Sequence, residues 1–202
     1  MINNLITTNK MKTIKVKFEG TTALMLNNPQ CINPMHPLSK ALKAITSKRN
    51  KTDEDHMEII HLQFLASPYL NKKGQYIIPS QMIAKSIEAG AKENKLGQKF
   101  QRSVLVLGDA LLNFADNGCS PEELYTDHNE TYVDVRAVGI MKAKVIAARM
   151  LIPEWSLEFE LSYDETQLNK SEIWNAINAA GLRHGIGTYR ACFGRYKAIE
   201  IK

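Results

Sequence analysis

The sequence predicts an α+β protein built on an antiparallel sheet with helical and loop insertions. Alternating apolar and polar segments stand near both ends of the chain, helix-forming segments lie between them, and stretches rich in proline and asparagine separate the two halves. The chain has 202 residues, 44% of them apolar and 23% charged, which is typical of one globular domain. Its three cysteines are widely separated, so neither a disulfide framework nor a cysteine zinc site is predicted.

The first strand is predicted at residues 12–19, where apolar and charged side chains alternate up to a glycine. Residues 1–11 carry no such pattern, and we interpret them as a flexible leader before a single domain that spans residues 12–202. No apolar run reaches the roughly 18 residues that a membrane helix needs. We therefore expect no membrane partner and a cytoplasmic location.

Three prolines and two asparagine-rich turns predict a long ordered loop over residues 21–37. A short basic helix is predicted over residues 39–49, and Thr52 with the acids after it predicts the start of a second helix. A hydroxyl N-cap and acidic side chains satisfy free backbone N–H groups and complement the helix dipole. The apolar side chains expected on the buried face of this second helix are Met57, Ile60, Phe64 and Leu65.

The middle of the chain predicts a hairpin over residues 69–78, followed by a helix that begins at Pro79. A strand is predicted at residues 103–107. The next segment, residues 108–130, is rich in acids, glycine and asparagine, and we interpret it as an acidic insertion that holds at most a short helix.

The last third predicts two strands at residues 132–140 and 145–152, then a clearly alternating strand at 155–163. A helix over residues 171–180 and a terminal strand at 197–201 complete the order. Strand, insertion, helix, strand, strand, helix and strand can be drawn as a split βαβ, ferredoxin-like sheet.

Charge is distributed in opposed blocks although the net charge is only +5. Residues 1–51 sum to +8, residues 109–135 to −7 and residues 136–151 to +4. This asymmetry is compatible with a face that binds a polyanion, and equally with a solvated mixed surface. A third possibility is head-to-tail association, in which an acidic face of one copy meets a basic face of the next.

Residues 181–195 hold four glycines and three arginines between a predicted helix and a predicted strand. A dinucleotide-binding glycine motif must follow a strand and open a helix, so that reading is rejected, and no lysine ends the loop as in a phosphate-binding P-loop. We expect Gly185, Gly187 and Gly194 to adopt positive φ and to let the backbone approach another chain closely. The arginines Arg183, Arg190 and Arg195 are then available for phosphates, unless the segment is a plain structural connection.

Three segments of this sequence resemble the RAMP superfamily of CRISPR RNA-binding proteins. These segments are residues 23–28 (Ala-Leu-Met-Leu-Asn-Asn) after the first strand, residues 78–80 (Ile-Pro-Ser) at a helix start, and the terminal glycine-rich segment. The resemblance implies an RRM-like ferredoxin fold and, by analogy with backbone subunits that coat guide RNA, binding of RNA. The compact size resembles that of phage-encoded relatives, which would place the protein in a bacterial host.

Catalytic and metal-binding candidates are weak. The five histidines are scattered, and two of them, five residues apart, do not fall on one helical face as a pair of zinc ligands would. Some RAMP proteins cleave RNA with histidine as acid or base, which makes His36 and His184 the candidates for such a role. A loop or capping histidine is the simpler interpretation, and we predict no catalytic residue, no metal and no cofactor.

The leading hypothesis is a non-catalytic protein that binds single-stranded RNA or DNA and assembles along the strand, as a homo-oligomer or within a nucleoprotein complex. Tyr132, Tyr189, Phe193 and Tyr196 are the aromatic candidates for stacking on bases, and Tyr189 is the one expected to be exposed. The alternatives are a protein-interaction module that imitates a backbone subunit, in the manner of an anti-CRISPR protein, and an endoribonuclease. The remaining predicted nucleic-acid-binding residues are Lys43, Lys48, Arg49, Lys142, Lys144, Arg149, Arg183, Arg190 and Arg195.

Overall fold

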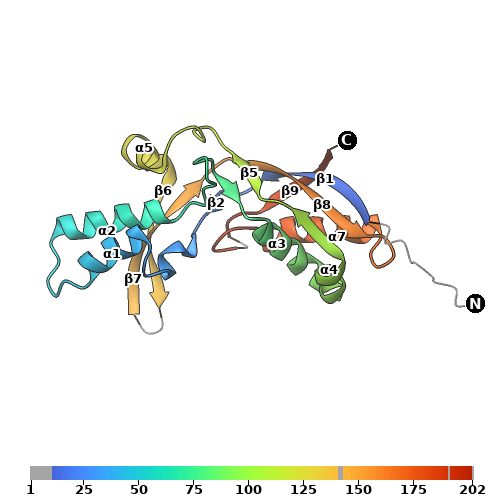
Figure 1. Ribbon diagram of the computed structural model, residues 1–202, viewed down its shortest axis with the longest axis horizontal. Helices are drawn as coiled ribbons and strands as arrows, with labels where there is room; N and C mark the ends of the chain where they lie inside the picture. The colour runs from blue at the N-terminus through green and yellow to red at the C-terminus, as the bar shows by residue number, and fades with distance from the viewer. Residues whose placement is uncertain (1–10, 141–142, 191, 202) are drawn as a thin grey trace, which may run out of the picture.

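Two insertions into an antiparallel sheet give the molecule its shape. The computed structural model describes residues 11–140, 143–190 and 192–201. The core sheet and its helices lie at one end, and a second lobe with a β-hairpin and further helices lies at the other (Figure 1). Among the residues described, no helix is both long and apolar enough to cross a membrane.

The core sheet has the strand order β3-β5-β8-β1-β9, and β4 also pairs with β8. Within the described residues, its named strands pair antiparallel. Taken along the chain, β1, α3, β4 with β5, β8, α7 and β9 form the split βαβ arrangement, which confirms the predicted ferredoxin-like fold. The elements of this core are β1 (Met11–Gly20), β3 (Ile77–Ile78), α3 (Ser80–Glu93), α4 (Gly97–Ser103), β4 (Val104–Leu107), β5 (Ala110–Asn113), β8 (Ser156–Asp164), α7 (Lys170–Ala179) and β9 (Tyr196–Ile201).

Alternation in β1 and β8 produces the core. Val16 lies opposite Phe159 and Phe18 opposite Leu157, and Val16, Phe18 and Leu157 are fully buried. Phe18 also stacks on Tyr196 of β9 at a ring-centroid distance of 3.8 Å. Because side chains two residues apart in a strand share a face, this pattern fixes the register of the central strands.

The second lobe combines residues from both insertions. Its elements are β2 (Leu24–Met25), a 3₁₀ turn η1 (Pro29–Ile32), α1 (Pro37–Thr46), α2 (Asp53–Ala66), α5 (Pro121–Asp127), α6 (Asn129–Tyr132), β6 (Val133–Ile140) and β7 (Ala143–Ile152). Helix α2 lies along β7, where the backbone N–H of Ala148 donates to Gln63 (2.9 Å) and that of Met150 donates to Ser67 (2.8 Å). These side chains satisfy strand N–H groups that β6 does not reach.

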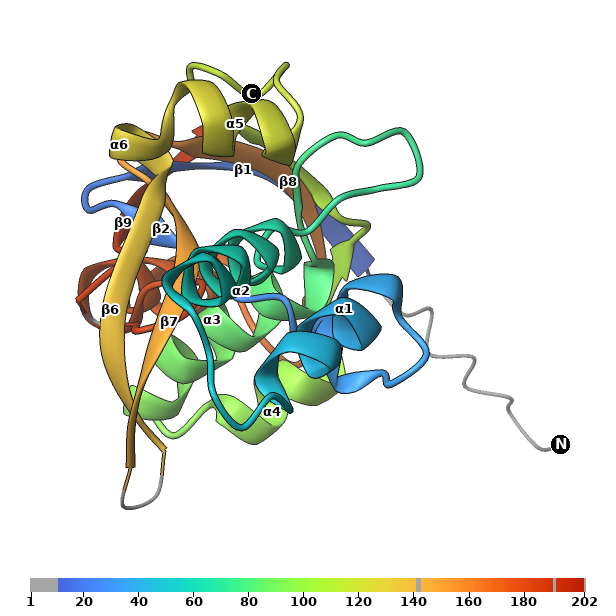
Figure 2. The same cartoon turned by 90° about the vertical axis from the view of Figure 1, so that its left-hand side faces the viewer.

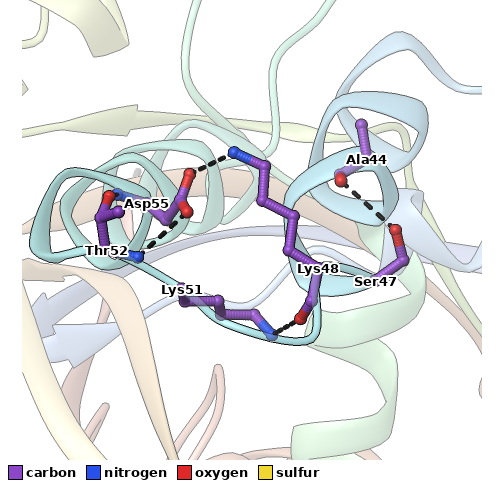
Figure 3. A network of polar contacts seen from close by, with 6 residues as sticks. All are labelled: Ala44, Ser47, Lys48, Lys51, Thr52 and Asp55. Atoms are coloured by element: carbon purple, nitrogen blue, oxygen red, sulfur yellow. Dashed lines mark hydrogen bonds and ion pairs between the residues drawn. The ribbon is translucent and has the colours of Figure 1, made fainter.

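The predicted start of α2 is confirmed in detail. Thr52 is the N-cap and forms a capping box with Asp55, in which each side chain bonds the other residue's backbone N–H (Figure 3). Of the four side chains expected on its buried face, Phe64 is buried, whereas Met57 is 62% exposed. Met57 lies near the free N-terminal end of α2, ahead of the turns that pack on β7.

Strand β5 was not predicted. It lies inside the segment interpreted as an acidic insertion, residues 108–130, and pairs with both β8 and β3. Four residues are too few to show a clear alternation, and the strand is defined by its long-range partners. The strand that begins the chain starts at Met11, and residues 1–10 of the predicted leader lie outside the described residues.

Candidate nucleic-acid interface

The glycine-rich connection, residues 185–195, is tied to the segment that follows β1. The backbone N–H of Gly194 donates to the carbonyl of Ala23 (2.8 Å), and that of Thr188 donates to the carbonyl of Met25 (2.9 Å). The connection follows a short π-helical turn, η2 (Ala180–His184), and leads into β9. It is therefore held on both sides by regular structure.

The glycines of this connection adopt the expected backbone conformation, with φ of 66° at Gly185, 87° at Gly187 and 71° at Gly194. The close approach that they permit is to this chain itself. A Cβ atom on Gly194 would lie 1.8 Å from the carbonyl oxygen of Ile186, and one on Gly187 would lie 2.5 Å from that of Met25. The glycines thus build the connection into the fold.

A buried polar network between α3, the connection and β9 holds the connection in place. The Ser86 hydroxyl of α3 donates to the carbonyl oxygen of Gly185 (2.8 Å) and lies 3.0 Å from the Tyr196 hydroxyl. Ser86 and Ile186 are fully buried, and burial raises the pKa of Tyr196. Since a buried hydroxyl needs its partners, this network holds the backbone of the connection in one position.

Four side chains join the connection to the β6–β7 hairpin, and we call them the arginine–aromatic cluster: Arg136, Arg149, Tyr189 and Phe193. The guanidinium carbon of Arg149 lies 4.8 Å from the centre of the Tyr189 ring. The guanidinium carbon of Arg136 lies 5.5 Å from the same ring and 4.9 Å from that of Phe193. Tyr189 has a φ of 49° and is 40% exposed, so part of its ring is open to solvent.

Strand alternation explains why two arginines reach this place. Arg149 lies between Ala148 and Met150, which are buried, so its side chain points to the opposite face of β7. Across the hairpin Arg149 faces Asp134, and Arg136 is two residues further along β6 on the same face. In Figure 2, α1 and α2 lie on one side of the hairpin and the red C-terminal connection on the other.

The two arginines differ in their electrostatic surroundings. Arg136 donates two hydrogen bonds of 2.5 Å to the carboxylate of Asp134, which raise the pKa of Arg136. Arg149 has no acidic side chain within ion-pair distance among the described residues. Arg149 therefore keeps its charge available for an added anion, while Arg136 mainly braces the two rings.

The other predicted arginines of the C-terminal segment also differ in whether a carboxylate pairs with them. Arg183 forms a bidentate ion pair with Glu93 of α3, and His184 lies 2.7 Å from that carboxylate. These contacts lower the pKa of Glu93 to about 2. Arg190 is exposed and has no ion-pair partner in the described part of the chain. Arg195 is partly buried, and its Nε atom has no hydrogen-bond partner among the described residues.

The basic residues near α1 form a separate group. The Nζ atom of Lys48 lies 2.6 Å from Asp55, and Lys51 donates to the Lys48 carbonyl oxygen (Figure 3). Lys43 stands in the last turn of α1, and Arg49 is exposed after it. Helix α1 lies in the second lobe, at the end of the molecule away from the core sheet (Figure 1).

Two predicted lysines belong to the end of the hairpin: Lys144 is exposed near the start of β7, and Lys142 lies outside the described residues. Among the aromatic candidates, Tyr132 and Tyr196 are buried and contribute to the core. Arg136 is the residue of the cluster that sequence reasoning missed. Its signal was the alternation of Asp134 and Arg136 in a predicted strand, which places both on one face.

The histidine candidates have structural contacts. The Nδ1 atom of His36 accepts a hydrogen bond from the Leu38 backbone at the start of α1, so His36 is a capping residue. His184 contacts Glu93 as described above. Within residues 11–140, 143–190 and 192–201, no group of three or more potential metal ligands is found.

Comparisons with known proteins place the fold. No family model and no curated protein matches the sequence. A chain in a cryo-EM structure of the Type III-B Cmr-beta bound to cognate target RNA aligns with 95% of this chain at a TM-score of 0.51 and 15% identity. The alignment covers 61% of that longer chain. The crystal structure of Cmr6 from Pyrococcus furiosus aligns at a TM-score of 0.41 and 10% identity, over 95% of this chain and 99% of Cmr6.

At these identities the likeness concerns the fold. The aligned region includes nearly the whole chain, and so both the ferredoxin-like core and the inserted lobe. This agrees with the fold that the resemblance of these sequence segments to the RAMP superfamily implied. The protein therefore has an α+β fold shared with a chain of the Cmr-beta structure.

Proposed function

We propose that the protein binds single-stranded nucleic acid without cleaving it. The observation that carries this proposal is the partly exposed Tyr189 ring, which lies close to Arg136 and Arg149 and next in the chain to the free Arg190. An exposed ring among guanidinium groups suits a base that stacks on it and phosphates that lie beside it. The similar chain of the Cmr-beta structure comes from a complex with target RNA, which supports this class of ligand.

The arrangement assigns different roles to the side chains. A base stacks on Tyr189, whose position is fixed by the arginines and by the tethered backbone on either side of it. Arg149 and Arg190 bind phosphates, because neither is neutralised by a described carboxylate. We assign Arg195 to the same interface, whereas Arg183 is already paired with Glu93.

The basic residues of the hairpin and of the α1 region are proposed as outlying contacts. Lys144 extends the surface along β7, and Lys43, Lys48 and Arg49 lie on the second lobe. A strand that reaches both groups would run along the molecule and leave space for a further copy. We therefore keep assembly along the strand, or within a nucleoprotein complex, as part of the proposal.

A fluorescence-anisotropy titration tests this function. Labelled single-stranded RNA, single-stranded DNA and their duplexes are titrated at two or more salt concentrations. We expect a preference for a single strand and a logarithmic salt slope of about −0.7 for each phosphate contact, because bound lysine and arginine release condensed counterions. The RNA is recovered after incubation and should be intact.

Three outcomes would contradict the proposal. Absence of binding at low salt would remove nucleic acid as the ligand and favour the protein-interaction hypothesis. Equal affinity for duplexes would argue against base stacking on Tyr189. RNA that is shortened by the wild-type protein, but stays intact when a reagent blocks the histidine side chains, would favour the endoribonuclease.

A further inference from the structure

A hollow lies between α3 and the glycine-rich connection, and we call it the α3 pocket. Its volume is about 250 Å³, and it is lined by Gln81, Met82, Lys85, Ile186, Gly187 and Arg190. The first three residues lie on one face of α3, since positions three and four apart in a helix are neighbours. Only Arg190 among them was singled out by the sequence as a ligand-binding side chain.

Two cationic side chains line the pocket, and its lining residues include no acid. Lys85 and Arg190 are exposed, and neither forms an ion pair with a described residue. The acid one turn further along α3 is Glu88, which is already bound by Lys92 (2.6 Å) and Gln101 (2.7 Å). The pocket is therefore suited to an anion.

The lining is also partly apolar. Ile186 is fully buried, Met82 is partly buried, and Gly187 adds no side chain. Gln81 adds an amide, which offers one hydrogen-bond donor group and one acceptor side by side. An inorganic anion would use only the cationic side chains, whereas a nucleotide has a flat apolar ring, a polar ring edge and a phosphate. The lining matches all three parts.

The position of the pocket relates it to the proposed site. Arg190 directly follows Tyr189, and its side chain lines the pocket. A strand whose base stacks on Tyr189 thus brings its next phosphate to Arg190 and its next nucleotide to α3.

We propose that the α3 pocket holds the nucleotide adjacent to the one stacked on Tyr189, with its phosphate between Lys85 and Arg190 and its base edge against Gln81. The inference rests on the proposed function and deepens it. It adds two residues of α3 to the interface and assigns Gln81 the reading of the base. A glutamine amide forms paired hydrogen bonds with a base edge, which makes the contact sensitive to the base.

The first test compares Lys85→Gln with the control variant Lys99→Gln. Lys99 is an exposed lysine on α4, outside the pocket, so both variants lose one charge from a helix surface. We expect Lys85→Gln to bind a labelled single strand about tenfold more weakly at low salt, with a salt slope smaller by about 0.7. Lys99→Gln should bind like the wild-type protein.

The second test concerns the base. Affinities for short strands of oligo-A, oligo-C and oligo-U are compared for the wild-type protein and Gln81→Ala. We expect the spread among these affinities to narrow by about fivefold in Gln81→Ala, with an unchanged salt slope because no charge is lost. Circular dichroism of each variant checks that the fold is retained, as expected for exposed helix positions.

The outcomes separate the two proposals. If the wild-type protein binds the strand, but the affinity of Lys85→Gln equals that of Lys99→Gln, the proposal for the α3 pocket is overturned and the proposed function stays in place. An unchanged spread in Gln81→Ala would overturn the role of Gln81 as the reader of the base. No binding by the wild-type protein would overturn the proposed function, and this inference with it.

Discussion

Two basic segments that look alike in the sequence differ in how their charges are used. In the segment from α1 to α2, Lys48 is bound by Asp55, and this contact lowers the pKa of the Asp55 carboxyl. In the glycine-rich connection, residues 185–195, the sequence contains no acid at all. There, no described carboxylate pairs with Arg190. The comparison shows that availability of a basic side chain depends on which carboxylates the fold brings to it.

The two segments also differ in how firmly they are held. Helix α1 contains no buried residue. The glycine-rich connection, in contrast, is bonded to the backbone after β1 and rests on the buried Ile186 and Ser86. A side chain on such a connection loses less freedom when it binds a ligand, because its backbone is already ordered. We therefore expect the connection to contribute more affinity per charge than the α1 region.

The largest expected effect is on stability, from Gly194→Ala. The new Cβ would lie 1.8 Å from the Ile186 carbonyl oxygen, at a φ of 71°. We expect the free energy of unfolding to fall by about 3 kcal/mol, because a backbone clash adds to the strain of positive φ. Chemical denaturation measures this loss.

Gly74→Ala is the matched control for that variant. Gly74 has a φ of 77°, but a Cβ atom there would meet nothing within 4 Å. Only the conformational strain remains, and we expect a loss of about 1 kcal/mol. Equal losses in the two variants would show that Gly194 does not approach the Ile186 carbonyl as closely as described.

The second prediction compares Arg190 with Lys48 in nucleic-acid binding. We expect Arg190→Ala to weaken binding by about 1–3 kcal/mol, the range of a charge-assisted hydrogen bond, with little change in stability. Arg190→Lys should recover part of the loss, since a lysine has the charge without the planar fork. Lys48→Gln should cost no more than about 0.5 kcal/mol in binding, because Asp55 already neutralises that charge.

Anisotropy titrations and thermal melting of the three variants distinguish the possible results. If the two Arg190 variants melt at lower temperature while the folded protein binds normally, Arg190 is a structural tether of β9. If Lys48→Gln weakens binding as much as Arg190→Ala, pairing with a carboxylate does not decide which charges bind.

The long strands of the core sheet could be predicted from the sequence, because the alternation of apolar and polar side chains is a local pattern. β1 and β8 alternate over nine or ten residues each, and Thr52 with Asp55 marks the start of α2 within four residues. β5 could not be predicted, since its four residues become a strand only through β8 and β3. Long periodic elements and short capping motifs can thus be predicted from the sequence, whereas short strands with distant partners cannot.

The candidate site shows the same division. The positive φ of the glycines could be predicted, because their residue type permits it and their clustering suggests a need for it. The contact between Arg149 and Tyr189 joins residues forty positions apart, and no local pattern records it. Nor does the sequence reveal that Glu93 binds Arg183. Only the fold shows which arginines of one basic segment remain free.

The smallest expected effect concerns the pair of Glu93 and Arg183. Glu93→Gln sharpens the comparison because it removes the ion-pair partner of Arg183, which lies just before the glycine-rich connection. Arg183 and His184 lower the pKa of Glu93 from 4.5 to about 2. The carboxylate therefore stabilises the folded protein at pH values above the ordinary pKa, and this contribution is lost as the pH falls toward about 2. The pair is exposed, so salt weakens it. The wild-type protein should melt at a slightly higher temperature than Glu93→Gln at neutral pH, and the difference should vanish at the acidic end of that range.

At neutral pH the freed Arg183 of Glu93→Gln should bind one more phosphate, which increases the magnitude of the salt slope by about 0.7. A variant with an unchanged slope would show that Arg183 lies off the path of the strand, whatever its pairing.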